Sequence, residues 1–64
     1  MSIYPNPAKD NLYFNEETQA EIIDIQGRVL YKTTEAVKSV NISNLKSGIY
    51  FIKTDNKIQK FVKE

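Results

Sequence analysis

The apolar residues of this chain occur in short bursts rather than at the three- and four-residue spacing of a helix. The bursts are rich in Ile, Val, Tyr, Phe and Thr, and clusters of Asn, Asp, Gly, Pro and Ser separate them, as in strands joined by turns. Seven segments are therefore predicted as strands: Ile3–Tyr4, Leu12–Asn15, Ala20–Ile25, Arg28–Lys32, Val37–Ile42, Ile49–Thr54 and Ile58–Lys63. This cadence predicts an all-β fold, a small Greek-key-like β-sandwich of about seven short antiparallel strands.

The order of apolar and polar residues within the segments indicates how the strands face. Val40 and Ile42 alternate with polar residues, so this strand should have one face in water. The runs Ile22–Ile25 and Ile49–Ile52 break strict alternation, and both strands are expected to be central in a sheet or to carry a bulge. The stretch Glu16–Ala20 is too short for a helix and is expected to be a loop.

Two hairpins are predicted from the residues between strands. Asp55 and Asn56 tolerate the left-handed conformation that a two-residue hairpin turn requires. Gln26 and Gly27 form the second turn, in which the glycine supplies the positive φ.

A longer connection, Asn44–Gly48, joins two further strands. Within it, Leu45 is expected to fold back over the core, and Gly48 to permit a tight return into the next strand.

Composition restricts the chemistry that the chain can perform. With 64 residues, it is expected to form one domain that buries only about 60% of its unfolded surface. It has no cysteine and no histidine, which excludes disulfides, thiolate or histidine metal sites and the usual nucleophilic triads. A net charge of +1 gives no bulk field to attract nucleic acid, and the longest apolar run, Ile49–Ile52, is far too short to span a membrane. No cofactor, nucleic-acid partner or membrane insertion is therefore predicted.

Carboxylates are the remaining candidates for catalysis, because two of them can perform acid–base or glycosidic chemistry. Nearly all lie in predicted turns or on wet strand positions, but Asp24 is surrounded by isoleucines. It is expected to accept hydrogen bonds from the next turn or to pair with Arg28, and catalysis is the less favoured alternative. A domain of this size also lacks the depth for a substrate pocket, so no enzyme activity is predicted.

A second group of residues is both basic and aromatic: Tyr50, Phe51, Lys53, Lys57, Lys60, Phe61 and Lys63. On paired strands they could stack nucleic-acid bases and contact phosphates. Lysines on outer strands also protect sheet edges from aggregation, and the near-neutral charge favours that simpler interpretation.

Four motifs follow one another along the chain, and together they resemble a known family. The first, Ile3–Asp10, contains Tyr-Pro-Asn-Pro; the next are Ala20–Val29 with its Gly-Arg pair, Val40–Tyr50, and Lys60–Lys63. In this order they resemble the type IX secretion C-terminal sorting domain (the Por secretion system, type A family). The positions that carry the resemblance are Tyr4, Pro5, Asn6, Pro7, Gly27, Arg28, Leu45, Gly48 and Tyr50.

The resemblance implies a single sorting domain over residues 3–64, with Met1 and Ser2 either native or added ahead of it. Such a domain is folded in the periplasm and directs a covalently fused upstream cargo through the outer membrane. Its implied partners are an outer-membrane translocon and a sortase-like peptidase, which removes the domain as cargo is secreted or attached to the cell surface. The last strand supplies the candidate residues for translocon recognition: Lys57, Lys60, Phe61, Val62 and Lys63. A homodimer remains open.

The alternative function is an adhesion or carbohydrate-binding β-sandwich, because such modules share this architecture and size. Tyr13, Tyr31 and Tyr50 are the residues that could stack on sugars.

Overall fold

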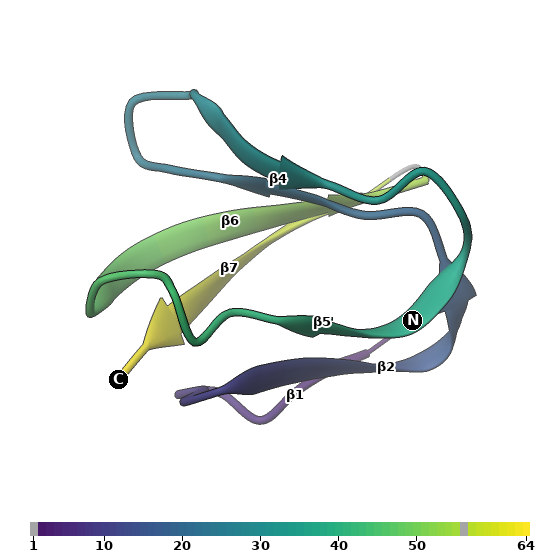
Figure 1. The fold of residues 1–64 in the computed structure, drawn as a ribbon, viewed down its shortest axis with the longest axis horizontal. Helices are drawn as coiled ribbons and strands as arrows, with labels where there is room; N and C mark the ends of the chain where they lie inside the picture. The colour runs from purple at the N-terminus through teal and green to yellow at the C-terminus, as the bar shows by residue number, and fades with distance from the viewer. Residues whose placement is uncertain (1, 56) are drawn as a thin grey trace.

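Two antiparallel sheets pack face to face in the computed structural model, which describes residues 2–55 and 57–64 (Figure 1). The strands are β1 (Ile3–Tyr4), β2 (Asn11–Thr18), β3 (Glu21–Ile23), β4 (Val29–Lys32), β5 (Val37–Asn41), β6 (Gly48–Thr54) and β7 (Lys57–Lys63). Sheet A has the order β1-β2-β5, and sheet B has the order β4-β3-β6-β7 (β5 is marked β5′ in Figure 1). The predicted all-β class with seven antiparallel strands is confirmed.

The connections between the sheets have a Greek-key-like character. The consecutive strands β2 and β3 lie in different sheets, and so do the consecutive strands β5 and β6. Strand β2 pairs with β5 in sheet A, while β3 pairs with β6 in sheet B. These two pairs of neighbours, β2 with β5 and β3 with β6, are therefore joined through intervening strands that cross to the other sheet, and this ties the two sheets together.

The core lies between the two sheets and consists of their inward-facing side chains. Its buried apolar residues are Ala8, Leu12, Phe14, Ala20, Ile22, Val40, Ile42, Ile52 and Phe61. Val40 and Ile42 are buried while the polar residues between and around them are exposed, as the alternation predicted. The described part of the chain includes no helix of the length and apolar character needed to cross a membrane.

The predicted loop at Glu16–Ala20 is wrong, because β2 continues to Thr18. Its second half is polar and mostly exposed, and only Thr18 of this half is buried. The pairing of β2 with β5 also shifts between Tyr13 and Thr18. Apolar alternation therefore could not reveal this part of the strand.

The apolar segment Ala20–Ile25 forms a shorter strand than predicted. Strand β3 ends at Ile23, and Ile25 is 71% exposed in the following turn. Strand β3 is central, between β4 and β6, and its pairing with β4 shifts between Ile22 and Ile23. Strand β6 is central as well, between β3 and β7. The expectation of central or bulged strands is confirmed.

Glycines hold the turns as predicted, but one other turn residue does not. Gly27 has a φ of +88° in the hairpin between β3 and β4, and Gly48 begins β6 with a φ of +153°. The hairpin of β6 and β7 closes at the pair Thr54–Lys57. Of its two turn residues, Asn56 lies outside the described residues, and Asp55 does not take the expected left-handed conformation, since only glycines among the described residues have a positive φ.

Candidate functional site

The segment Pro5–Ala8 lies along the outer edge of β7, although the two are at opposite ends of the sequence. The backbone N–H of Ala8 donates to the carbonyl oxygen of Val62 at 2.8 Å, and the N–H of Glu64 donates to the carbonyl of Ala8 at 2.7 Å. These bonds form a parallel bridge between Ala8 and Lys63. The Oδ1 atom of Asn6 accepts a further hydrogen bond from the N–H of Val62, at 3.0 Å across 56 positions of sequence.

The two prolines explain why a side chain takes part in this contact. Pro5 and Pro7 lack a backbone N–H, so the segment cannot pair with β7 as an ordinary strand. The side-chain amide oxygen of Asn6 accepts the hydrogen bond that a backbone carbonyl would accept in a regular strand pair. The peptide bonds before both prolines are cis. Ala8 is fully buried, so its small side chain fits between β7 and the core.

The contacts with Pro5–Ala8 cover the outer edge of β7 only at the end near Lys63. In a β-strand, successive residues direct their backbone groups to opposite edges. Val62 and Glu64 point theirs away from β6, toward Pro5–Ala8. Toward the other end of β7, no strand of the described chain pairs with this edge. Edge strands with free backbone groups are open to further pairing, and this segment removes that opportunity at the end it covers.

The side chains of β7 divide between the core and the surface. Phe61 is fully buried and stacks on Tyr50, with ring centroids 5.8 Å apart. Lys63 is 8% exposed, and its Nζ donates to the carbonyl oxygen of Glu64 at 2.9 Å. Lys57 and Lys60 are exposed, and Val62 is partly exposed. A partner that meets the folded domain can therefore touch Lys57, Lys60 and Val62, whereas Phe61 and Lys63 are buried.

The loop that precedes β6 is fixed by two residues of the family pattern. Leu45 packs against the core, as predicted, and its N–H donates to the carbonyl of Ile42 at 3.0 Å. The phenol of Tyr50 donates to the carbonyl of Lys46 at 2.7 Å. Gly48, where this loop ends, pairs with Lys63 of β7. The loop and the closed end of β7 are therefore neighbours.

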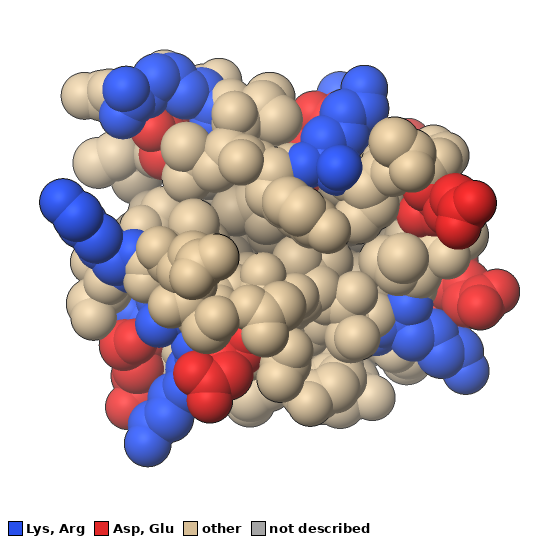
Figure 2. Space-filling view, in the orientation of Figure 1, with Lys and Arg blue, Asp and Glu red and all other residues tan. Residues whose placement is uncertain are grey.

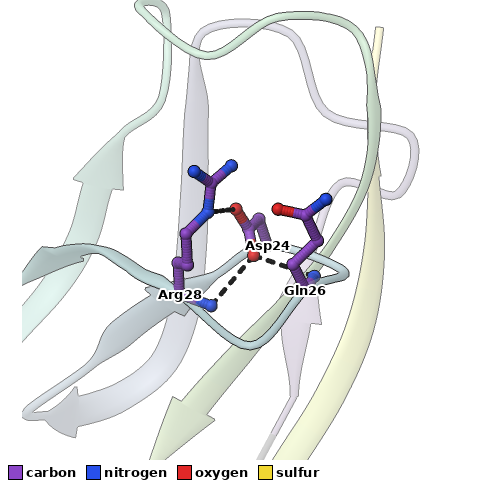
Figure 3. A network of polar contacts seen from close by, with 3 residues as sticks. All are labelled: Asp24, Gln26 and Arg28. Carbon is purple, nitrogen blue, oxygen red and sulfur yellow. Dashed lines mark hydrogen bonds and ion pairs between the residues drawn. The ribbon is translucent and has the colours of Figure 1, made fainter.

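Asp24 organises the hairpin that leads into β4 (Figure 3). Its Oδ1 atom accepts hydrogen bonds from the backbone N–H groups of Gln26 and Arg28, both at 2.9 Å. Its Oδ2 atom accepts from the Nε of Arg28 at 2.8 Å. The expectation that Asp24 bonds the next turn and pairs with Arg28 is confirmed.

These bonds stabilise the ionised carboxylate. The hydrogen bond from the Arg28 backbone is the largest cause that lowers the pKa of Asp24 below its ordinary value of 3.8, and the Arg28 side chain and the Gln26 backbone act in the same direction. Partial burial opposes them. A carboxylate held ionised in this way stabilises the turn. It is unsuited to act as a general acid near neutral pH, because that role would need a raised pKa.

The other sequence candidates for binding do not assemble into one surface. Tyr13 stacks on Tyr4 outside sheet A, with ring centroids 5.9 Å apart, whereas Tyr31 is on the edge strand β4 and Tyr50 packs against the core. In the basic and aromatic group, Tyr50 and Phe61 face the core, whereas Phe51 is partly exposed on the other face of sheet B, where it pairs with Lys60. Among residues 2–55 and 57–64, no cluster of carboxylates could hold a metal ion.

No pattern in the sequence predicts the contact between Asn6 and Val62 or the burial of Ala8 against the last strand. Asn6 and Ala8 both lie in a segment whose prolines indicate a turn, and a turn does not specify a distant partner. The only local sign is the small side chain at position 8, directly after Pro7.

Comparison with models of protein families gives a match over nearly the whole chain. The family described as "Secretion system C-terminal sorting domain" matches residues 2–64, which includes both Pro5–Ala8 and β7. Neither the curated proteins nor the solved structures contain a significant match to this chain.

Proposed function

Since this chain belongs to the secretion system C-terminal sorting domains, the sorting signals of the type IX secretion system, we propose that it carries one upstream cargo protein through the full export sequence. Membership implies contact with the type IX machinery and passage of cargo across the outer membrane to the cell surface or beyond. In the proposed sequence, the domain folds in the periplasm and the outer-membrane translocon recognises it. A sortase-like peptidase then removes it, and the cargo is attached to the surface or released. Sorting domains are generally non-catalytic.

The covered edge of β7 is the observation that supports recognition of a folded unit. The family pattern at Tyr4–Pro7 and the last strand are distant in sequence, yet Asn6 and Ala8 bond directly to Val62. A signal read as an extended peptide would need no such contact. We propose that this contact sets the position of β7, so that Lys57, Lys60 and Val62 are presented in a fixed arrangement to the translocon.

Export of a reporter tests this function. Residues 2–64 are fused behind a periplasmic reporter protein in a strain that has a type IX system. The reporter is expected at the cell surface or in the medium, as it is when a known sorting domain replaces this one. Retention of the reporter in the periplasm, while the known domain delivers it, would contradict the proposal. Deletion of residues 61–64 should also prevent export, because it removes Phe61 from the core and Val62 from the covered edge.

Removal of the domain is tested on the same exported reporter. Mass spectrometry of the surface or medium fraction should find the reporter without residues 2–64. Inactivation of the peptidase in the host should leave the domain attached. Exported reporter that retains the whole domain in the unmodified host would show that processing is not part of this chain's function.

A further inference from the structure

The outer face of sheet B is apolar, although it lies on the side of the sheet away from the core. Residues that pair across antiparallel strands point to the same face. Ile22, Ile52 and Phe61 face the core, so the residues next to them in each strand face outward. The apolar members of this outer face, taken over all four strands, are Ile23, Val29, Ile49, Phe51, Ile58 and Val62.

Several of these side chains are well exposed. Val29 is 53% exposed, Ile49 48% and Ile58 60%. Ile23 and Phe51 lie between them in the central strands and are partly exposed. Contiguous apolar surface of this kind on a soluble protein usually marks an interaction site.

The outer face of sheet A, in contrast, is mainly polar, as is usual for a sheet face in contact with water. There the residues that alternate with the core are mainly polar, such as Asn11, Ser39 and Asn41, and all three pair across β2 and β5. The aromatic exceptions are Tyr4 and Tyr13, which pair across β1 and β2 and stack on each other. An antiparallel sheet with one face in water normally alternates in this way, and sheet B does not.

The charges on the outer face of sheet B indicate which kind of partner covers it. Glu21 pairs with Lys32 on one side and with Lys53 on the other, and Lys60 pairs with Phe51. The face thus carries three lysines and one glutamate around its apolar centre. A second copy of this chain would place lysines against lysines, which is unfavourable.

We propose that the outer face of sheet B docks on a protein component of the type IX machinery whose own surface is apolar at its centre and bordered by carboxylates. An apolar centre with a polar rim is the general anatomy of protein interfaces. This inference rests on the proposed export function and assigns it to a surface. It extends the contact beyond β7 to β3, β4 and β6.

Paired substitutions on the reporter fusion test the apolar part of the proposal. The variant Val29→Thr/Ile49→Thr keeps β-branched side chains but adds two hydroxyl groups to the face. It is expected to lower the exported fraction at least tenfold, while the melting temperature of the purified domain changes by only a few degrees. Unchanged export would overturn the proposal.

The matched control lies on the flank between the edge strands β4 and β5. Figure 2 shows this flank in the orientation of Figure 1, in which β4 lies above and β5 below; charged side chains follow the outline, and the centre is uncharged. Leu30 and Tyr31, which are 43% and 50% exposed, line a cavity on this flank with Ile22 and Ile42. The variant Leu30→Thr/Tyr31→Thr should leave export within twofold of the parent. An equal loss in both pairs of variants would overturn the assignment to the outer face of sheet B.

A second pair of variants tests the charge of the partner. Lys32→Gln/Lys53→Gln removes positive charge from the face, and Lys38→Gln/Lys46→Gln makes the same change in net charge elsewhere. Export should fall at least threefold in the first pair only. Equal export in the two pairs would contradict a partner bordered by carboxylates.

Further measurements separate this inference from the proposed function and from other occupants. If the parent fusion is not exported, the proposed function fails; if parent and Val29→Thr/Ile49→Thr are exported equally, only this inference fails. The purified domain should be monomeric in sedimentation velocity and should not bind vesicles of phosphatidylethanolamine and phosphatidylglycerol. A dimer, or vesicle binding, that the same variant abolishes would assign the face to a second copy or to lipid and would overturn the proposal.

Discussion

The two edge strands of sheet B, β4 and β7, differ in whether another segment is hydrogen-bonded to their outer edge. At β7, Asn6 and Ala8 cover the outer edge with three hydrogen bonds, and Phe61 anchors the strand in the core. At β4, no strand pairs with the outer edge in the described chain, and all four residues are exposed. The sheet therefore has one edge fixed by a distant segment and one edge held only by its neighbour β3.

The difference shows what the Tyr-Pro-Asn-Pro segment does physically. A domain of this size has a small core and no cysteine for a disulfide, so an edge strand without an outer neighbour would open easily. The segment supplies the missing neighbour for β7, and its prolines stop it from becoming a further strand. At the open edge, β4 is held instead by the Asp24 turn that precedes it. The charged side chains of Arg28 and Lys32 lie at its two ends, and such charges discourage an edge strand from pairing with other chains.

The largest contrast is expected between the anchors of the two edge strands. Phe61→Ala removes a fully buried ring from β7 and should cost about 3–5 kcal/mol of unfolding free energy, enough to unfold much of a marginal domain. Tyr31→Ala on β4 removes a half-exposed ring and should cost far less. Urea denaturation followed by circular dichroism measures both. A loss below 1 kcal/mol for Phe61→Ala would contradict the burial of this strand.

The next effect concerns the space beneath the covering segment. Ala8 is fully buried, so Ala8→Leu should overpack the contact with β7 and cost about 1–3 kcal/mol. Ala36→Leu, at an exposed position, is the matched control and should change stability by less than about 0.5 kcal/mol. The same denaturation experiment compares them. Equal stabilities would mean that position 8 does not pack against the last strand.

Backbone conformation should matter similarly at both edges. Gly27 lies in the hairpin before β4 and Gly48 lies opposite Lys63 of β7, and both have positive φ. An added Cβ atom would meet nothing within 4 Å at either position, so the cost of Gly27→Ala or Gly48→Ala comes from the backbone alone. Each should lose about 1–3 kcal/mol. Thermal melts that match the parent would show that the positive φ values are not required.

A smaller, pH-dependent effect is expected at the hairpin that leads to the open edge. The pKa of Asp24 is lower in the folded state than its ordinary 3.8, so the unfolded state takes up the proton first as the pH falls. The stability that Asp24 contributes is therefore present above that ordinary value and is lost as the pH falls through the lowered one. Asp24→Asn should be less stable than the parent at pH 7, with a difference that shrinks toward pH 3. A difference that does not depend on pH would contradict this origin.

Local chemistry allowed parts of both edges to be predicted from the sequence. Asp24 and Gly27 stabilise a turn formed by residues close to them in sequence, so the turn before β4 could be predicted from residue types alone. The core positions Val40 and Ile42 followed from strict alternation. Where neighbours are close in sequence, the physical reasons are contained in the segment itself.

The covered edge and the outer face could not be predicted in the same way. The bond between Asn6 and Val62 depends on how the two sheets pack, and no local pattern specifies this. The isoleucine-rich runs in β3 and β6 correctly indicated central strands, but the same residues also form an apolar outer face. A run of apolar residues breaks strict alternation both when a strand is buried on its two faces and when one of its apolar faces is exposed, so the sequence alone does not distinguish these two cases.

Amide hydrogen exchange at Val62 and Glu64 tests most directly whether residues 5–8 fix the last strand. In the parent domain, both N–H groups should exchange slowly because Asn6 and Ala8 accept their hydrogen bonds. In Asn6→Ala, the Val62 amide should exchange at least tenfold faster, while Asn44→Ala, at an exposed loop position, should leave it unchanged. Rapid exchange of Val62 and Glu64 in the parent, at the rate of an unprotected chain, would contradict the account.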